Sequence, residues 1–183
     1  MINTNSNLTT KVLLPKIEKF FTLTEKKIQS INNSWDSEKG TPVFTVKGKY
    51  TSQGWTEWTQ GFQFGCMILQ YDATSDKTFL DMGRDKTIKY MAPHVSHIGV
   101  HDHGFNNVST YGNLLRLIRE KRISSDNQAS DFYELALKVS GAVQASRWTQ
   151  ISPDLGYIHS FNGPQSLFAD TMRSLRSLML SYQ

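Results

Sequence analysis

Cysteine is nearly absent from this chain of 183 residues, which contains Cys66 alone. One cysteine excludes an internal disulfide and a metal site built from several thiolates, and it leaves the redox compartment open. A long apolar run is also missing, since no stretch approaches the ~20 residues that a membrane-spanning helix needs. The first seven residues are polar and lack the parts of a secretory signal. We therefore expect a soluble protein with no membrane partner, cytoplasmic by default, or periplasmic if a signal peptide has been removed.

Charge of one sign is in small excess. Lysine and arginine total 20 against 16 aspartate and glutamate residues, a net charge of +4, and the basic residues are scattered along the chain. Domains that bind nucleic acids usually concentrate basic residues in a stripe interleaved with aromatics. We therefore expect no nucleic acid partner, whereas an acidic sugar remains compatible. The 38% hydrophobic and 20% charged content is typical of one globular domain, here residues 1–183.

Strand-like alternation is scarce, whereas apolar residues recur at helical spacing in six segments. Asp76 and Asp131 stand where the N-caps of the third and fifth helices are expected, and Pro93 is expected to end the third. Segment 32–53 is predicted as a loop, and 156–159 as a short extended piece. The predicted helices cover residues 9–31, 58–71, 76–90, 108–118, 132–147 and 166–182.

Six helices without a persuasive strand predict an all-α fold of stacked antiparallel helix pairs. No short repeat of the kind that marks a regular solenoid is present. In the second helix, Gly61 and Gly65 lie four residues apart and would let another backbone or a ligand approach closely. The same helix has one strongly apolar face, which consists of Trp58, Phe62, Cys66 and Leu69.

The aromatic residues at the start of that helix have two interpretations. Trp55, Trp58 and Phe62 could belong to the core, which is the usual place of an aromatic stripe. They are also interleaved with threonine, glutamate, glutamine and glycine. Such a mixture is suited to stacking on a sugar ring while hydrogen-bonding its hydroxyls. The residues alone leave core and sugar platform open.

Asp102 is a candidate acid/base because it lies between His101 and His103 and precedes Gly104 and Phe105. A carboxyl group that is partly desolvated near aromatic rings has its charged form disfavoured, which raises its pKa toward the range of a general acid. The alternative is that Asp102 caps the helix that follows, which is a more common role for an aspartate at such a position.

Four of the five histidines fall within ten residues, at His94, His97, His101 and His103. Imidazoles close in sequence can converge on zinc or iron. No HExxH pattern is present, however, and no carboxylate or thiolate partner is evident. We therefore expect positioning and substrate hydrogen bonding from these side chains, with no metal and no cofactor. A histidine-based metal protein is retained as a competing interpretation.

Three elements of the sequence, taken in order, resemble the first half of the unsaturated glucuronyl hydrolases, glycoside hydrolase family 88. The first is Trp58-Thr-Gln-Gly-Phe62, followed by the stretch 69–80, and the second is His101-Asp102-His103-Gly104-Phe105. The third combines Gly156-Tyr157-Ile158-His159-Ser160-Phe161 with Phe168-Ala-Asp170. The resemblance spans residues 55–182, and the HD-x-GF element after W-T-x-GF is its most specific part.

The resemblance implies an (α/α)6 barrel and a hydrolase that removes an unsaturated uronic acid from the non-reducing end of oligosaccharides made by polysaccharide lyases. In that family water adds across the C4–C5 double bond, and the unstable product rearranges to release the sugar. Retaining and inverting schemes with two carboxylates therefore need not apply. The implied partner is an acidic oligosaccharide.

Site residues follow from the resemblance position by position. Asp170 is implied as the principal acid/base, which protonates the double bond and activates water. Asp102 is implied as the second essential carboxylate, which holds sugar hydroxyls and tunes its partner. The subsite for the unsaturated ring is implied to be lined by Trp58, Phe62, His101 and Phe161, with Phe161 in a place where the family usually has tryptophan.

Six helices correspond to about three helical hairpins, half of the implied barrel. A half barrel exposes apolar helix faces, which favours self-association or a second chain that completes the ring. The family also draws further site residues from its second half. We therefore expect little or no turnover by this chain alone, and a non-catalytic carbohydrate-binding or assembly fragment of the same fold is the alternative function.

Overall fold

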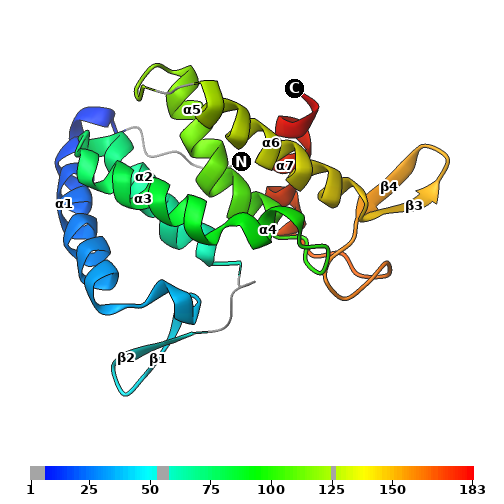
Figure 1. Cartoon of the computed structure of the whole chain (residues 1–183), viewed down its shortest axis with the longest axis horizontal. Coiled ribbons are helices and arrows are strands. Elements are labelled where there is room, and N and C mark those ends of the chain that lie inside the picture. The colour runs from blue at the N-terminus through cyan, green and yellow to red at the C-terminus, as the bar shows by residue number, and fades with distance from the viewer. Residues whose placement is uncertain (1–6, 53–57, 125–126) are drawn as a thin grey trace.

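The computed structural model describes residues 7–52, 58–124 and 127–183. These residues form a mostly helical domain (65%) with seven α-helices and two small β-hairpins. The helices pack against one another, and the hairpins lie at the periphery (Figure 1). The α-helices are α1 (Thr10–Ser34), α2 (Gln60–Thr74), α3 (Lys77–Tyr90), α4 (Ala92–Ser96), α5 (Asn113–Arg119), α6 (Asn127–Ala145) and α7 (Thr171–Tyr182).

The prediction of a mainly helical fold is confirmed, and the described helices show no closed barrel. Short helical segments of other types complete the set, namely a 3₁₀ turn η1 (Ser37–Lys39) and a π-helical segment η2 (Gly104–Gly112) that continues into α5. No helix in the described ranges is both long and apolar enough to span a lipid bilayer.

Several predicted helix ends agree with the structure. The Asp76 carboxylate accepts from the Thr78 amide at 2.9 Å and caps α3, as expected. The same helix ends at Tyr90, and Pro93 then lies in the first turn of α4, where its missing amide hydrogen has no helical partner to lose. The Asp131 cap is wrong, because α6 starts at Asn127 and Asp131 lies inside it.

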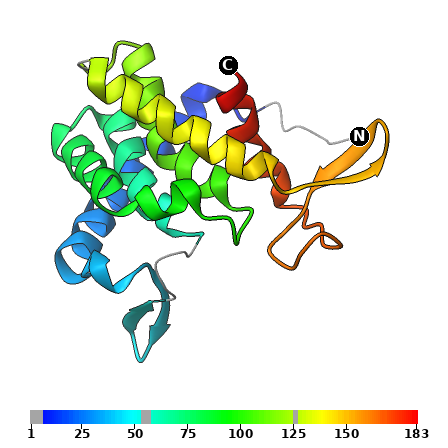
Figure 2. The same cartoon turned by 45° about the vertical axis from the view of Figure 1, so that its right-hand side comes forward.

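The structure contains four short strands, whereas the sequence offered no persuasive strand and only one short extended piece. Residues predicted as a loop contain the antiparallel hairpin β1 (Pro42–Val46) and β2 (Lys49–Ser52). Its tight turn uses positive φ at Lys47 (49°) and Gly48 (75°), the combination that two-residue hairpin turns prefer. A second hairpin pairs β3 (Trp148–Ser152) with β4 (Leu155–Ile158), the latter confirming the extended piece predicted near 156–159. Both hairpins project from the helices (Figure 2).

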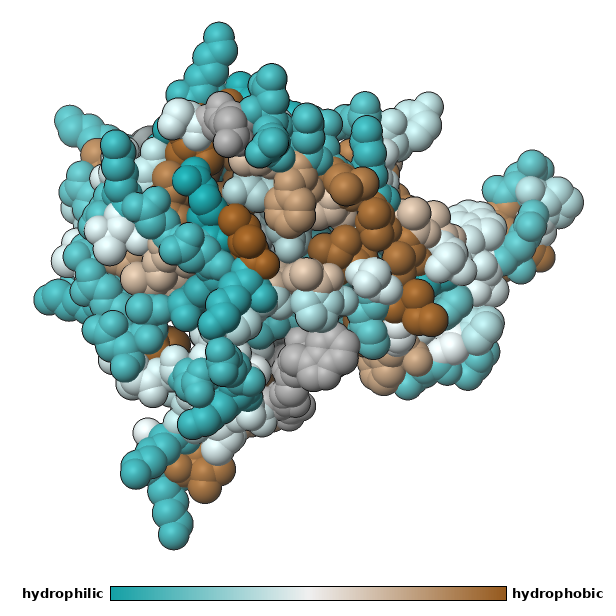
Figure 3. All heavy atoms as spheres, viewed as in Figure 1, coloured by the Kyte–Doolittle hydropathy of each residue, from teal (hydrophilic) through white to brown (hydrophobic). Residues whose placement is uncertain are grey.

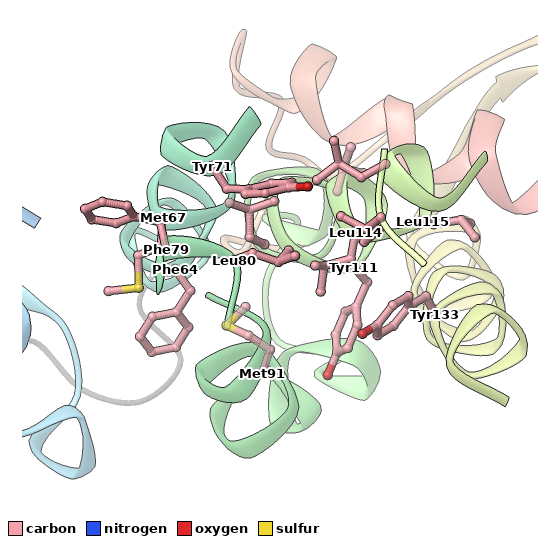
Figure 4. Close-up of a cluster of buried hydrophobic side chains, with 14 of the residues drawn as sticks. Phe64, Met67, Tyr71, Phe79, Leu80, Met91, Tyr111, Leu114, Leu115 and Tyr133 are labelled. Atoms are coloured by element: carbon pink, nitrogen blue, oxygen red, sulfur yellow. The ribbon is translucent and has the colours of Figure 1, made fainter. Parts of the chain in front are cut away.

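The core forms where α2 packs against α3, η2 and α5. Figure 4 shows the core side chains of these elements pointing toward one another, together with Tyr133 from α6. Among the most deeply buried are Phe64, Met67, Ile68, Phe79, Tyr111 and Leu114. Burying large apolar side chains of this kind stabilises the fold by ~1.5–3 kcal/mol each.

The apolar face identified on α2 is not the face that packs into the core, and two glycines supply the reason. A methyl group at Gly61 would lie 2.3 Å from the Asn106 Cα atom, and one at Gly65 would lie 2.7 Å from the Ser109 carbonyl oxygen. The glycine face therefore packs directly on the η2 backbone, as their spacing predicted. This packing turns another face outward, so Trp58 and Leu69 remain 46% and 45% exposed, Cys66 is exposed and Phe62 is half-buried.

Exposed apolar side chains also gather along α6, where Figure 3 shows a hydrophobic area on the surface. Phe132, Leu135 and Val139 of α6 line a shallow hollow of about 210 Å³ together with Ala92 and Val95 near α4. A comparable hollow of about 330 Å³ lies between α1 and α2 and is lined in part by Phe62 and Cys66.

Candidate active site

The segment before η2 buries three consecutive polar residues, His101, Asp102 and His103. Its position is determined by Gly104, the first residue of η2. A methyl group at Gly104 would lie 2.4 Å from the Arg173 carbonyl oxygen and 2.5 Å from the Ser174 Cα atom of α7. The start of η2 therefore rests on the first turns of α7 without an intervening side chain, and this contact brings the neighbourhood of Asp102 to that of Asp170.

Asp170 lies at the N-terminus of α7 and approaches His101 from there. Its Oδ1 atom is 3.1 Å from the Nε2 atom of His101, and Oδ1 of Asp102 is 3.8 Å from the same nitrogen. The two predicted catalytic carboxylates and the predicted histidine are thus brought together. Asp102 is 8% exposed, whereas the Asp170 side chain is 49% exposed, so one carboxylate is buried and the other faces solvent.

Neither carboxylate serves as a helix cap. No side-chain cap bond forms at the N-terminus of η2 or at that of α7. Capping was the alternative role for Asp102, and the structure does not show it. The last helix was predicted to start at residue 166, which would place Asp170 inside it, and this start is too early because α7 begins at Thr171.

The proton on His101 can be assigned from its surroundings. Its Nδ1 atom is buried and has no hydrogen-bond partner in the described part of the chain. A hydrogen on Nδ1 would be a buried donor without an acceptor, which is costly. The proton of the neutral ring therefore belongs on Nε2, where it is donated to Asp170.

The pKa of Asp102 is raised above its usual value. Burial makes the largest contribution, because it disfavours the charged carboxylate, and the charge of Asp170 acts in the same direction. His101 and Arg147 oppose the shift. Asp102 therefore retains a proton more readily than an exposed aspartate does.

Aromatic rings border the histidine. The Phe161 ring stacks on His101 with centroids 6.2 Å apart and an interplanar angle of 8°. Phe168 meets the same imidazole edge-on at 6.0 Å. The structure thus places the predicted residue Phe161 at the site. Phe168 was not predicted as a site residue, although it lies in the motif that contains Asp170.

Trp58 and Phe62 belong to a second aromatic group rather than to the rings around His101. Each lies within 5.8 Å of the Phe105 ring, measured between centroids. Phe105 follows Asp102 by three residues, and the Arg173 guanidinium lies 5.9 Å from its ring. Phe105, in the first turn of η2, therefore links the rings of Trp58 and Phe62 to the chain segment that carries Asp102. Phe105 belongs to the sequence motif but was not predicted as a site residue. Trp55 lies outside the described residues.

The histidine cluster does not converge. His103 Nε2 donates to the His97 carbonyl oxygen, and Nδ1 accepts from the Ser140 hydroxyl, both at 2.9 Å. Burial lowers the pKa of His103 to about 4, so the ring is neutral. His94 Nε2 is 2.6 Å from the Gln60 side-chain oxygen. These two histidines hold the fold together.

A metal ion has one possible location in the described residues. Donor atoms of His101, Asp102 and Asp170 lie within 4.8 Å of one another, close enough for a single cation to bridge them. The hydrogen bond between His101 and Asp170 accounts for the same short distance without an ion.

Comparisons with known proteins add no relative, because no family model, curated protein or solved structure matches this chain. The function is therefore argued from the site itself.

Proposed function

We propose that this chain carries the site of a glycoside hydrolase that hydrates the C4–C5 double bond of an unsaturated uronic acid at the end of an oligosaccharide. The observation that carries the proposal is the meeting of Asp102 and Asp170 around His101. The resemblance to the unsaturated glucuronyl hydrolases singled out both carboxylates, which are far apart in the sequence.

In the proposed reaction Asp170 acts as the acid and base. Its proton adds to one carbon of the double bond, and the oxygen of a water molecule adds to the other carbon. The water proton then passes to the Asp170 carboxylate, so the acid is regenerated. The hydrated sugar rearranges and its bond to the next sugar breaks. Half exposure of Asp170 supports this role, because the group that exchanges protons must reach both substrate and water.

Asp102 would tune this proton transfer from its buried position. Burial of Asp102 disfavours its charged form, and the charge of Asp170 acts in the same direction, so Asp102 holds a proton at a higher pH than an exposed aspartate does. The raised pKa of Asp102 agrees with that role. The hydrogen bond from His101 keeps the carboxylate of Asp170 oriented.

The aromatic rings provide surfaces on which a sugar can stack. Phe161 and Phe168 pack edge to face, with centroids 5.4 Å apart, beside the carboxylates. Trp58, 46% exposed, offers a second surface next to Phe105. We assign the unsaturated ring to the rings of Phe161 and Phe168, because these lie beside the carboxylates.

The finer architecture that fits this function is half of an (α/α)6 barrel. In this arrangement α2, η2 with α5, and α7 would be the inner helices. The opposite side of the cleft would come from a second copy or another chain. One side alone binds substrate less completely, which is why low turnover is expected for the isolated chain.

The test is the loss of ultraviolet absorbance of the double bond in an unsaturated disaccharide, followed at high protein concentration. We expect slow turnover that Asp102→Asn and Asp170→Asn abolish. Asp131→Asn, an exposed position on α6, serves as the matched control and should behave as wild type. Wild-type protein that neither binds nor converts the disaccharide contradicts the proposal.

A non-catalytic carbohydrate-binding fragment is the second candidate, favoured by the open aromatic groups. Binding of the same disaccharide, measured by calorimetry, separates the two. Equal binding by wild type and both asparagine variants, with no turnover by any of them, identifies a binding protein.

A further inference from the structure

Arg147 is a buried arginine for which the proposed chemistry has no role. It lies between α6 and β3 and is 5% exposed. Its three guanidinium nitrogens all donate to backbone carbonyls. Nε donates to His159 at 3.0 Å, Nη1 to Ile98 at 2.5 Å and Nη2 to Ser160 at 2.6 Å.

These carbonyls belong to the two chain segments that form the site. Ile98 precedes His101 by three residues, and Ser160 begins the connection that carries Phe161 and ends at Asp170. The Arg147 guanidinium therefore links the segment that leads to Asp102 with the segment that leads to Asp170. This link is additional to the contact between Gly104 and α7. A planar group with donors in several directions can make these three bonds at once, whereas an ammonium group cannot reproduce the same geometry.

The charge of Arg147 is also directed at the site. Moving a cation into the protein interior costs several kcal/mol unless other groups compensate. Three carbonyl dipoles supply part of that compensation. Asp102 is the acid whose charge acts on Arg147, and in return Arg147 favours the ionised form of Asp102.

We propose that Arg147 is a positioning residue of this site, which holds segments 98–102 and 159–170 together and places a fixed positive charge beside Asp102. The positive charge of Arg147 lowers the pKa of Asp102, as His101 also does. Burial and the charge of Asp170 raise that pKa. This balance sets how readily Asp102 gives up its proton. The catalytic meaning of this balance rests on the proposed function, but the positioning itself does not.

The test measures the titration of Asp102 directly, by carbon-13 NMR of the side-chain carboxyl in the ligand-free full chain. The signal is assigned by its loss in Asp102→Asn. In Arg147→Met we expect the Asp102 midpoint to rise by about one pH unit or more, a tenfold change in proton affinity. Arg147→Lys keeps the charge and should give a smaller rise. Arg119→Met, which removes a surface partner of Glu134, should give none.

A folded Arg147→Met variant with an unchanged Asp102 midpoint overturns the proposal. If that variant does not fold, Arg147→Lys decides, because lysine loses the three-carbonyl linkage. In Arg147→Lys we then expect weaker nuclear Overhauser effects between the His101 and Phe161 rings, because these rings move apart. If both these effects and the Asp102 midpoint are unchanged, the proposal is overturned. Since no substrate is present, a shifted midpoint in a protein that neither binds nor converts the disaccharide would contradict the proposed function and leave the positioning role standing.

Discussion

At the scale of single residues, Asp102 and His103 are adjacent and buried but respond to pH in opposite ways. Burial favours the neutral form of both side chains. For the aspartate the neutral form holds the proton, so its contribution to stability is lost as the pH rises. For His103 the neutral form is the deprotonated one, so the contribution of this side chain to the stability of the fold is lost as the pH falls.

His103 gives the clearer prediction because its pKa falls from 6.5 to about 4. The unfolded chain binds a proton below pH 6.5 that the folded chain resists until about pH 4, so stability declines across that interval. The expected loss is up to about 3 kcal/mol. Urea unfolding at several pH values should show this slope in wild type and a flatter slope in His103→Gln. Equal slopes would contradict the assignment.

The three potential ligands His101, Asp102 and Asp170 allow a direct test for a metal. We expect no stoichiometric metal by elemental analysis of the purified protein, and no change in melting temperature when EDTA is added. The reason is that a proton on His101 already explains its short distance to Asp170. One equivalent of a divalent metal, or a drop of several degrees with EDTA, would support the competing metal-protein interpretation instead.

At the scale of elements, the contact between η2 and α7 determines whether the two carboxylates meet. Gly104→Ala places a methyl group against the Arg173 carbonyl and the Ser174 Cα atom, and backbone cannot move aside as a flexible side chain can. We expect a loss of ~1–3 kcal/mol in unfolding free energy together with loss of disaccharide binding. Gly112→Ala is the control, since its nearest contact is the Val108 side chain at 3.2 Å. Equal stability of the two variants would show that η2 and α7 are not in direct contact.

The sequence predicted the helices better than the pieces between them. Helical spacing identified α1, α2 and α3 because each carries enough apolar residues to define a face. The first hairpin and strand β3 were not predicted because strands of four or five residues give little alternation, although Lys47-Gly48 was an available turn signal. The exposure of the apolar face of α2 has a tertiary cause, since the glycine contacts with η2 decide the rotation of that helix and periodicity cannot reveal them.

Four residues that the resemblance singled out lie close together in the structure, although nothing in the local sequence connects them, namely His101, Asp102, Asp170 and Phe161. Their roles stay predictions. Trp58 and Phe62 form a separate group instead. Arg147 could not have been found, because its role depends on three carbonyl groups that carry no sequence signal.

At the scale of the whole molecule, the described helices form an open arrangement with two apolar edges. Contacts run from α1 to α2, from α2 to η2 and from η2 to α7, so α1 lies outside α2 on one side and α7 lies beyond η2 on the other (Figure 1). Leu23 of α1 is exposed near one edge, and Met172 and Met179 of α7 are exposed near the other. Exposed apolar patches of this kind favour association.

A second copy of the chain can cover both edges at once. A two-fold axis would place α1 of each copy on α7 of the other, so a single contact type forms twice and closes the assembly. We expect sedimentation velocity to show a concentration-dependent dimer. Leu23→Lys and Met179→Lys should each lower the fraction of dimer at least tenfold, since a lysine must then be desolvated in the contact. Leu155→Lys, on an exposed hairpin position away from both edges, should leave it unchanged. A monomer at every concentration, or a dimer that only the hairpin variant disrupts, would rule out this closure and leave another protein as the partner for these edges.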